Sequence, residues 1–230
     1  MGVTTRFPKG VTNVAKNNTL GMMGQLDPSK FHTYFSDFDT YAAADWTVTE
    51  TGTTTQALTA GDGGLLLVTN SAADNDATFM QLSVASFLME ANKKAFFKIR
   101  FKVSDATQSD VQVGLVITDA TPLDATDGIF FQKDDGDTHL DFYCQKDGST
   151  GQITTIDIGE LADDTYIDLG WYYDGSDAVD AYINDVKVAS LDASSTYLPD
   201  ATLAVSFGIQ NGEAVAKTMT VDYVLAAKER

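Results

Sequence analysis

The side chains with the most evident chemistry in this sequence are aspartates gathered in one predicted turn. Asp134, Asp135 and Asp137 lie within Lys133–Asp137, between two apolar segments, and Asp141 follows shortly afterwards. Carboxylates suit Ca²⁺, but a calcium site takes about six to eight oxygens, which usually come from several loops. Asp-Gly turns between strands have the same composition for conformational reasons alone. The turn is the favoured interpretation over the calcium site, and we predict no metal and no other cofactor.

Two tyrosines could form a platform for sugar rings. Tyr172 and Tyr182 alternate with apolar neighbours in the segment 166–190, YIDLGWYYDGSDAVDAYINDVKVAS, so each is expected on the polar face of a strand. Sugar binding needs exposed flat aromatic side chains with polar groups nearby. Trp171 lies on the opposite face and is expected to fill the core. Single outward tyrosines are also ordinary on β-sheets, so Tyr172 and Tyr182 are candidate glycan-binding residues.

A basic stripe is predicted on the strand 97–103, FKIRFKV. The alternation places Lys98, Arg100 and Lys102 on the face opposite the apolar residues. Such a stripe could dock an acidic partner, or it could pair with aspartates on neighbouring strands, each pair contributing about 0.2 to 1 kcal/mol. Pairing is favoured, because the chain holds 33 acidic residues.

Residues for catalysis are scarce. The chain has no H-E-x-x-H, G-x-S-x-G or Walker sequence, and its glutamates show no E-x-D-x-E arrangement. A Ser-His-Asp triad would have to use His32 or His139, which lie beside predicted strands in ordinary contexts. The single cysteine, Cys144, alternates with Leu140 and Phe142 and is expected to be a buried, inert thiol. We therefore predict that the protein is not an enzyme.

Short alternating strands, separated by Gly, Asp, Asn, Ser and Thr turns, must position these residues. Three strands and two turns, Asp174-Gly175 and Asn184-Asp185, occupy 166–190 alone. About a dozen strands are expected, with no convincing helix; only 83–92 leaves a helical turn and a strand as alternatives. Regular turns without βαβ alternation predict an all-β, antiparallel two-sheet β-sandwich or jelly roll. No internal repeat is visible, which argues against a propeller or solenoid.

Charge divides the chain into an arm and a body. Residues 1–30 hold four of the 15 basic side chains and one of the 33 acidic ones, a net charge of +3; the rest has 11 basic and 32 acidic side chains, a net charge of −21. We predict an extended N-terminal arm at 1–30 and a β-sandwich domain at 31–230. An acidic body repels nucleic acid and anionic membrane, so neither is an expected partner. No signal peptide or membrane-spanning run is predicted.

The body resembles the concanavalin A-like (laminin G-like) jelly-roll superfamily, on the residues DGIFFQKDDGDTHLDFYCQKDG and GWYYDGSDAVDAYINDVKVAS. In that superfamily a strand, an Asp-Gly turn and a second strand with a similar a-Y-i-N-d pattern recur. The resemblance covers about residues 31–230 and implies the fold. It does not choose a ligand, because the same sandwich serves lectins, hydrolases and structural proteins.

The N-terminal segments TTRFPKGVTNV and TLGMMGQLDPSKFHTYFSDFDTYAAADWTVT resemble the openings of structural proteins of tailed bacteriophages, particularly marine T7-like ones. This resemblance covers roughly residues 3–49. It implies a non-enzymatic virion protein, made in the host cytoplasm, that decorates the capsid surface as a symmetric oligomer such as a trimer. Its partner would be the major capsid protein. The alternative function is that of a lectin-like domain that binds surface glycans. The predicted capsid-binding residues belong to the arm: Arg6, Phe7, Pro8, Lys9, Val11 and Lys16.

Overall fold

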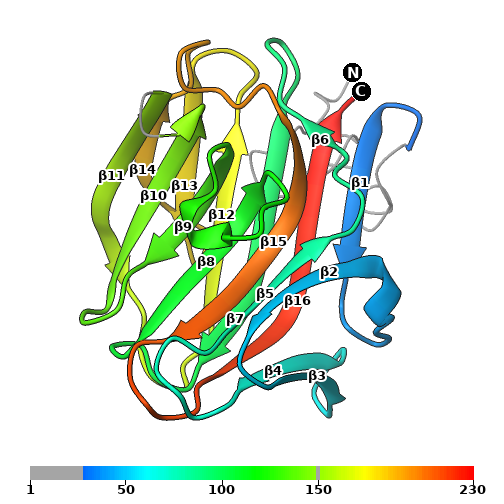
Figure 1. Cartoon of the computed structure of the whole chain (residues 1–230). Coiled ribbons are helices and arrows are strands. Elements are labelled where there is room, and N and C mark those ends of the chain that lie inside the picture. Colours follow the sequence, from blue (N-terminus) through cyan, green and yellow to red (C-terminus); the bar gives the residue numbers. More distant parts are fainter. Residues whose placement is uncertain (1–27, 149–150) are drawn as a thin grey trace.

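The computed structural model describes residues 28–148 and 151–230, which form a two-sheet antiparallel β-sandwich (Figure 1). The predicted all-β fold class is confirmed. The predicted arm lies almost wholly outside the described residues, and so do Arg6, Phe7, Pro8, Lys9, Val11 and Lys16. Their role in docking stays a prediction. Residues 28–30 are described, and there Arg230 donates hydrogen bonds to the carbonyls of Pro28 and Lys30, each at 2.9 Å.

Sheet 1 has eight strands, in the order β14-β13-β12-β7-β16-β4-β3, with β1 also paired to β16. Their bounds are β1 Phe31–Ser36, β3 Thr54–Thr59, β4 Leu65–Asn70, β7 Ala95–Val103, β12 Ile167–Tyr173, β13 Ala178–Ile183, β14 Val186–Asp192 and β16 Thr218–Glu229.

Sheet 2 also has eight strands, in the order β11-β10-β9-β8-β15-β5-β2, with β6 paired to β15. It lies toward the viewer in Figure 1. The bounds are β2 Trp46–Thr51, β5 Ala77–Leu82, β6 Phe87–Leu88, β8 Ser109–Val116, β9 Gly128–Lys133, β10 His139–Lys146, β11 Gly151–Glu160 and β15 Thr202–Asn211. The open segment 83–92 therefore contains a two-residue strand. Helical structure among the described residues is limited to short 3₁₀ turns, including Ala43–Asp45 and Pro122–Asp124, and no helix there is long and apolar enough to cross a membrane.

The core lies between the sheets and follows from the alternation along the strands. In β7 every second residue from Ala95 to Val103 is buried, and Phe97 stacks on Trp171 of β12 with 6.1 Å between ring centroids. Trp171 is fully buried, as predicted. Cys144 is also fully buried, as predicted, and burial raises the pKa of its thiol to about 12.

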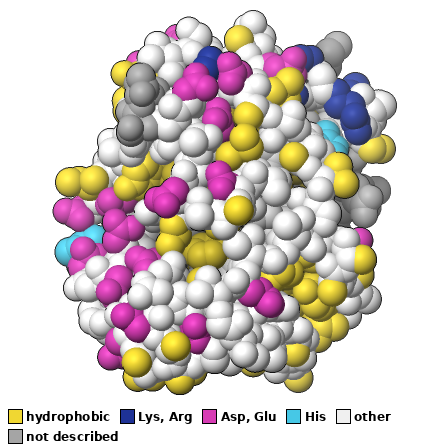
Figure 2. Space-filling view, in the orientation of Figure 1, with side chains coloured by type: hydrophobic (Ala, Val, Ile, Leu, Met, Phe, Trp, Pro, Cys, Tyr) yellow, Lys and Arg dark blue, Asp and Glu magenta, His cyan; other side chains and the backbone are white. Residues whose placement is uncertain are grey.

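Acidic side chains gather unevenly on the surface. In Figure 2, seen from the same side as Figure 1, they are dense on the left and lower left, over the part of sheet 2 formed by β9, β10 and β11. This half of the sheet includes the predicted acidic turn between β9 and β10. Within that turn Asp134 accepts the amide of Gln132 at 2.9 Å, and Asp137 accepts the backbone N–H of His139 at 2.9 Å. These local hydrogen bonds fit the turn interpretation.

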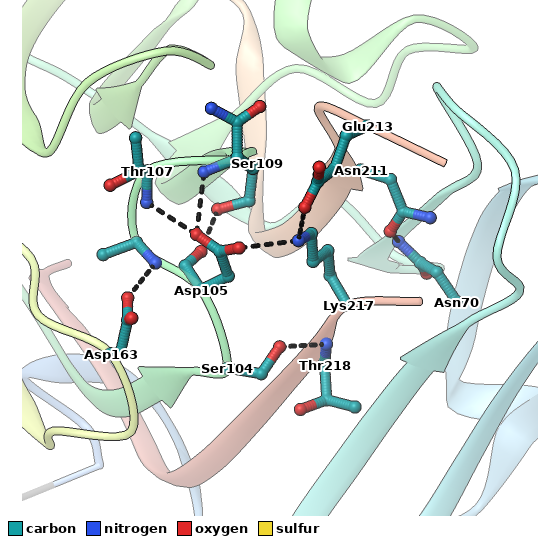
Figure 3. A network of polar contacts seen from close by, with 12 residues as sticks. Asn70, Ser104, Asp105, Thr107, Ser109, Asp163, Asn211, Glu213, Lys217 and Thr218 are labelled. Atoms are coloured by element: carbon teal, nitrogen blue, oxygen red, sulfur yellow. Dashed lines mark hydrogen bonds and ion pairs between the residues drawn. The ribbon is translucent and has the colours of Figure 1, made fainter. Parts of the chain in front are cut away.

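One end of the sandwich is closed by a polar network of paired groups (Figure 3). Lys217 is 2% exposed, and its ammonium contacts Asp105 at 2.6 Å and Glu213 at 2.7 Å. Asp105 also accepts the backbone N–H groups of Thr107 and Gln108. Burial alone would raise the pKa of Asp105, but these hydrogen bonds and Lys217 outweigh it and lower the pKa. The network joins the β7–β8 loop to the β15–β16 loop and has a structural role.

Candidate functional site

The outer face of sheet 1 carries both tyrosines that the sequence singled out. Tyr172 of β12 pairs with Asp180 of β13, and Gly170 pairs with Tyr182, so the two side chains project from neighbouring strands on one face. Both are half-buried. Tyr172 packs beside Phe96 against Phe31 and Ala227, and burial raises its pKa to about 12, with Asp174 adding to the effect. The structure places Tyr172 and Tyr182 on one face, as predicted. Part of the Tyr172 ring is covered by its packing neighbours.

The basic stripe lies on the same face, and its charges are paired. Arg100 contacts Asp168 at 3.4 Å and Asp222 at 2.9 Å. Lys98 contacts Asp185 at 2.7 Å, and Lys102 contacts Asp164 at 3.5 Å. The favoured interpretation of pairing within the body is confirmed. Positive and negative groups therefore balance one another across the outer face of sheet 1.

The outer face of sheet 2 has a different composition. Val111, Val113 and Leu115 of β8 belong to the core, and so do Ile129 and Phe131 of β9. The residues between them must therefore face outward. The register aligns Gln112 of β8 with Gln132 of β9, and Gln132 with Asp141 of β10. Two amides and one carboxylate thus form a continuous row across three strands.

Two further carboxylates flank this row. Asp110 lies on β8 two residues before Gln112, and Asp134 lies two residues after Gln132. Burial raises the pKa of Asp110, and Asp134 adds to the shift; burial likewise raises the pKa of Asp141, again with a contribution from Asp134. Within the described ranges, no Lys or Arg forms an ion pair with any of these three aspartates. The fold therefore places these three aspartates close together although their negative charges repel one another.

An aromatic pair adjoins the carboxylates. Phe130 of β9 stacks on Tyr143 of β10 with 5.0 Å between centroids and 10° between planes. The Tyr143 hydroxyl is 3.5 Å from Asp141, and burial, then Asp141, raise its pKa to about 12. Gly114 lies opposite Phe130 in the register, and a Cβ there would come within 2.5 Å of the Phe130 Cβ. Phe130 therefore leaves room only for glycine at position 114.

Two polar side chains on this face lack hydrogen-bond partners. Both amide atoms of Gln112 and the hydroxyl of Ser206 are buried without one. Gln81, on the same face and equally buried, is fully engaged: it donates to the carbonyl of Ile117 at 3.1 Å and accepts the N–H of Asp119 at 3.0 Å. Because buried polar groups are almost always paired, the unpaired ones mark a place where a water or a ligand hydroxyl completes the site.

The β8–β9 loop, residues 117–127, lies over the other half of this face. Ala125 of the loop packs with Val116 and Phe130, with Ile117 and Tyr143 at the edge. Gln145 of β10 donates to the Ala125 carbonyl at 2.9 Å, which holds the loop down. In Figure 1 the loop is seen in front of sheet 2. The loop forms one boundary of the site, and the row of Gln112, Gln132 and Asp141 with its flanking aspartates forms the other.

Neither histidine forms part of a triad. His139 lies among carboxylates, with Asp137, Asp157 and Glu160 between 3.6 and 3.8 Å from its ring nitrogens. His32 contacts the hydroxyl of Ser86 at 2.9 Å. Burial lowers the pKa of His32, followed by the positive charges of Arg230 and Lys228. No carboxylate in the described residues bonds to its other nitrogen, so this Ser-His pair lacks the group that would orient a base.

The arrangement on sheet 2 is suited to hydroxyl-rich ligands. Carboxylates and amides supply acceptors and donors, and Tyr143 supplies a ring beside them. The residues are Asp110, Gln112, Gln132, Asp134, Asp141 and Tyr143, which we call the acidic row. The sequence drew attention to Asp134 and Asp141 as a candidate calcium turn, and it gave no signal for the two glutamines.

Comparison with known proteins supports the fold at low sequence identity. No protein-family model matches the chain, and no curated protein matches it by sequence. Among solved structures, an endo-1,3-β-glucanase from Streptomyces sioyaensis is 12% identical over 89% of this chain and 99% of its own, with a TM-score of 0.65. A GH16 protein of Bacteroides ovatus for mixed-linkage glucan, solved with a product, is 13% identical over 83% and 98%, with a TM-score of 0.59.

A third similar structure comes from a phage. It is a carbohydrate esterase of the Shiga toxin-encoding bacteriophage phi24B, 13% identical over 85% of this chain and 96% of its own, with a TM-score of 0.53. These similarities define the class: the described chain is a concanavalin A-like jelly-roll sandwich. The class includes proteins that act on carbohydrates, and at these identities the likeness extends to the fold alone.

Proposed function

We propose that the protein binds a polysaccharide on the outer face of sheet 2, at the acidic row. The observation that carries the proposal is the row Gln112–Gln132–Asp141, which places two amides and a carboxylate in register beside the Tyr143 ring. Within the described ranges none of these carboxylates forms an ion pair with a Lys or Arg, although the buried Lys133 nearby offsets part of the rise that burial causes in the pKa of Asp110. The Gln112 amide is buried without a hydrogen-bond partner. Each carboxylate keeps further lone pairs, to which sugar hydroxyls would donate.

The ligand class follows from this chemistry and from the neighbours. The Tyr143 ring would stack on the apolar face of a sugar ring, while Gln132 and Asp141 would bond to its hydroxyls. The high negative charge excludes acidic polysaccharides, because like charges repel across the interface. Since one similar structure is an endo-1,3-β-glucanase and another is described with mixed-linkage glucan, neutral glucans of these kinds are the first ligands to test.

Binding without cleavage is the activity proposed. Glycoside hydrolysis needs two carboxyl groups facing each other across the scissile bond, and their separation sets the stereochemistry. Here each carboxylate near the row accepts a hydrogen bond from its own surroundings: Asp110 from the N–H of Asp135, Asp141 from the N–H of Asp157, and Asp134 from Gln132. These carboxylates stabilise the local backbone and the neighbouring side chain, so we do not assign them the roles of acid and base in glycoside hydrolysis.

Virion attachment through the arm is compatible with this function. The positive charge of residues 1–30 and the negative body support an arm that lies on a partner while the sandwich projects from it. In this proposal the protein sits on a phage capsid and presents its sugar-binding face outward. A chain lacking residues 1–30 should keep its sugar binding and lose its binding to phage heads; retention of head binding would contradict the role of the arm.

The test of sugar binding uses the full chain with laminarin and barley β-glucan as neutral probes, in affinity electrophoresis. We expect retardation of the wild type and loss of retardation in Asp141→Asn, which preserves shape and removes charge. Asp185→Asn, on the outer face of sheet 1, is the matched control and should migrate through the glucan like the wild type. Absence of retardation in the wild type would contradict the proposal. Release of reducing ends from the glucans would show that the protein hydrolyses them and would contradict binding without cleavage.

A further inference from the structure

A second cluster of carboxylates lies away from the acidic row, where three distant segments meet. Asp127 ends the β8–β9 loop, Asp147 lies in the turn after β10, and Asp200 lies just before β15. One carboxylate oxygen from each falls within 4.8 Å of the others. Among the described residues, this is the one group of three potential metal ligands that lie so close together.

A buried and unpaired oxygen distinguishes this cluster from an ordinary acidic surface. Asp127 is 5% exposed. Its Oδ2 accepts the hydroxyl of Thr126 at 3.0 Å, while its Oδ1 is buried with no hydrogen-bond partner. Burying a carboxylate oxygen without a donor is costly, and buried charges are normally paired or coordinate a metal. A positive group is therefore expected to complete the coordination of Asp127.

Lys146 supplies part of that charge. Its ammonium contacts Asp200 at 2.6 Å. Three carboxylates and one ammonium leave a charge of −2, which one divalent cation would neutralise.

The backbone around Asp127 is held in place without a cation. The Asp127 carbonyl accepts the N–H of Ile117 at 2.9 Å, which closes the base of the β8–β9 loop. The carbonyl of Thr126 accepts the N–H of Gly148 at 2.8 Å, which ties Asp127 to the turn that carries Asp147. The ligands from two of the three segments are thus prepositioned, so binding would require little ordering of the chain.

We propose that Asp127, Asp147 and Asp200 form a binding site for a divalent cation, and that Ca²⁺ is the ion it takes. All three ligands are carboxylates, which suit hard cations and offer neither the nitrogen nor the sulfur preferred by zinc. Asp147 and Asp200 are exposed, so water can fill the remaining positions of a flexible seven- or eightfold shell, whereas Mg²⁺ demands a near-ideal octahedron. The site stands independently of sugar binding. The ion would fix the loop that borders the acidic row.

The test is calcium titration of the full, EDTA-treated chain by calorimetry and by thermal unfolding, in 150 mM NaCl. With two exposed ligands we expect a Kd of about 0.1 to 1 mM, the range of extracellular calcium modules. At a hundredfold excess over Kd, the Tm should rise by about 5 to 10 °C. The double variant Asp147→Asn/Asp200→Asn should bind at least about tenfold more weakly, because it loses two charges.

Two further variants serve as controls for the double variant. Asp147 has a φ of +54°, a conformation that Asn also tolerates, so the substitution leaves the turn unstrained. Asp62→Asn, an exposed position in another turn, should bind calcium like the wild type. Lys146→Gln, which removes the competing ammonium, should tighten binding severalfold. The proposal is overturned if calcium produces no more heat or Tm shift than NaCl of equal ionic strength, or if the double variant binds like the wild type.

Discussion

The outer faces of the two sheets both carry aspartates and tyrosines, but the aspartates have different partners on each face. On sheet 1, Arg100 lies between Asp168 and Asp222, and the two neighbouring lysines of β7 each contact an aspartate. On sheet 2, burial and then the charge of Asp134 raise the pKa values of Asp110 and Asp141, next to an amide with no partner. Charges that satisfy each other stabilise a face, whereas in our proposal the carboxylates without an ion pair accept hydrogen bonds from a ligand.

The largest effect is expected from breaking the balanced face. Arg100→Met removes the cation between Asp168 and Asp222, whose side chains are 17% and 20% exposed. It should lower the free energy of unfolding by about 2 kcal/mol, less than for a fully buried pair because Arg100 keeps some contact with water. Urea denaturation measures this. Lys98→Met is the control, since Asp185 is 78% exposed, and it should cost about 0.5 kcal/mol or less. Equal costs would mean that pairing does not organise this face.

A smaller change in the free energy of unfolding, of opposite sign, is expected from replacing Gln112. Gln112→Met replaces an unpaired buried amide with an apolar side chain of similar shape, and it should raise the free energy of unfolding by about 1 kcal/mol. The matched variant Gln81→Met breaks two hydrogen bonds on the same face and should lower it by about 1 to 2 kcal/mol. A loss of stability in Gln112→Met as large as that in Gln81→Met would show that the Gln112 amide is not free.

The smallest effect is a pH dependence at the acidic row. Because the folded pKa values of Asp110 and Asp141 lie above the ordinary value of 3.8, their contribution to stability is full below that pH and is lost as the pH rises through the folded pKa. Asp110→Asn keeps an acceptor for the Asp135 N–H and should be more stable than the wild type by a few tenths of a kcal/mol, about 0.3, at pH 7. The difference should shrink as the pH falls toward 4.

The wild type will also show an opposing trend in acid. The pKa of Asp105 is lowered, so its contribution is present at neutral pH and is lost as the pH falls through the folded value. Comparing the unfolding free energies of wild type and Asp110→Asn at each pH cancels this background. A difference that grows in acid would contradict the predicted direction for Asp110.

The sequence predicted the fold because strand periodicity is a local property. The alternation in 95–103 coincides with β7, and the two turns in 166–190 separate β12, β13 and β14. β3, Thr54–Thr59, gives no strand signal in the sequence, because its polar, threonine-rich residues show no apolar alternation and both faces are largely exposed. The segment 83–92 holds only a two-residue strand, which is too short to leave a periodic signal.

The candidate site was harder to predict because it depends on register. Tyr172 and Tyr182 come from one hairpin, so their common face could be foreseen. Gln112, Gln132 and Asp141 come from three strands, and their alignment becomes visible only once the pairing is known. The same holds for Asp127, Asp147 and Asp200, which come from three connections. Alternation shows on which face a residue lies, and it cannot show which residues are neighbours across the sheet.

The most direct test of the central claim compares the two faces in one ligand-binding measurement. Calorimetric titration of laminarin and barley β-glucan should give a measurable Kd for the wild type. Tyr143→Ala, on sheet 2, should weaken binding by about tenfold, equivalent to about 1.4 kcal/mol. The double variant Tyr172→Ala/Tyr182→Ala, on sheet 1, should bind like the wild type. Loss of binding in the sheet 1 variant with unchanged binding in Tyr143→Ala would contradict the account and assign the ligand to the face that the sequence first indicated.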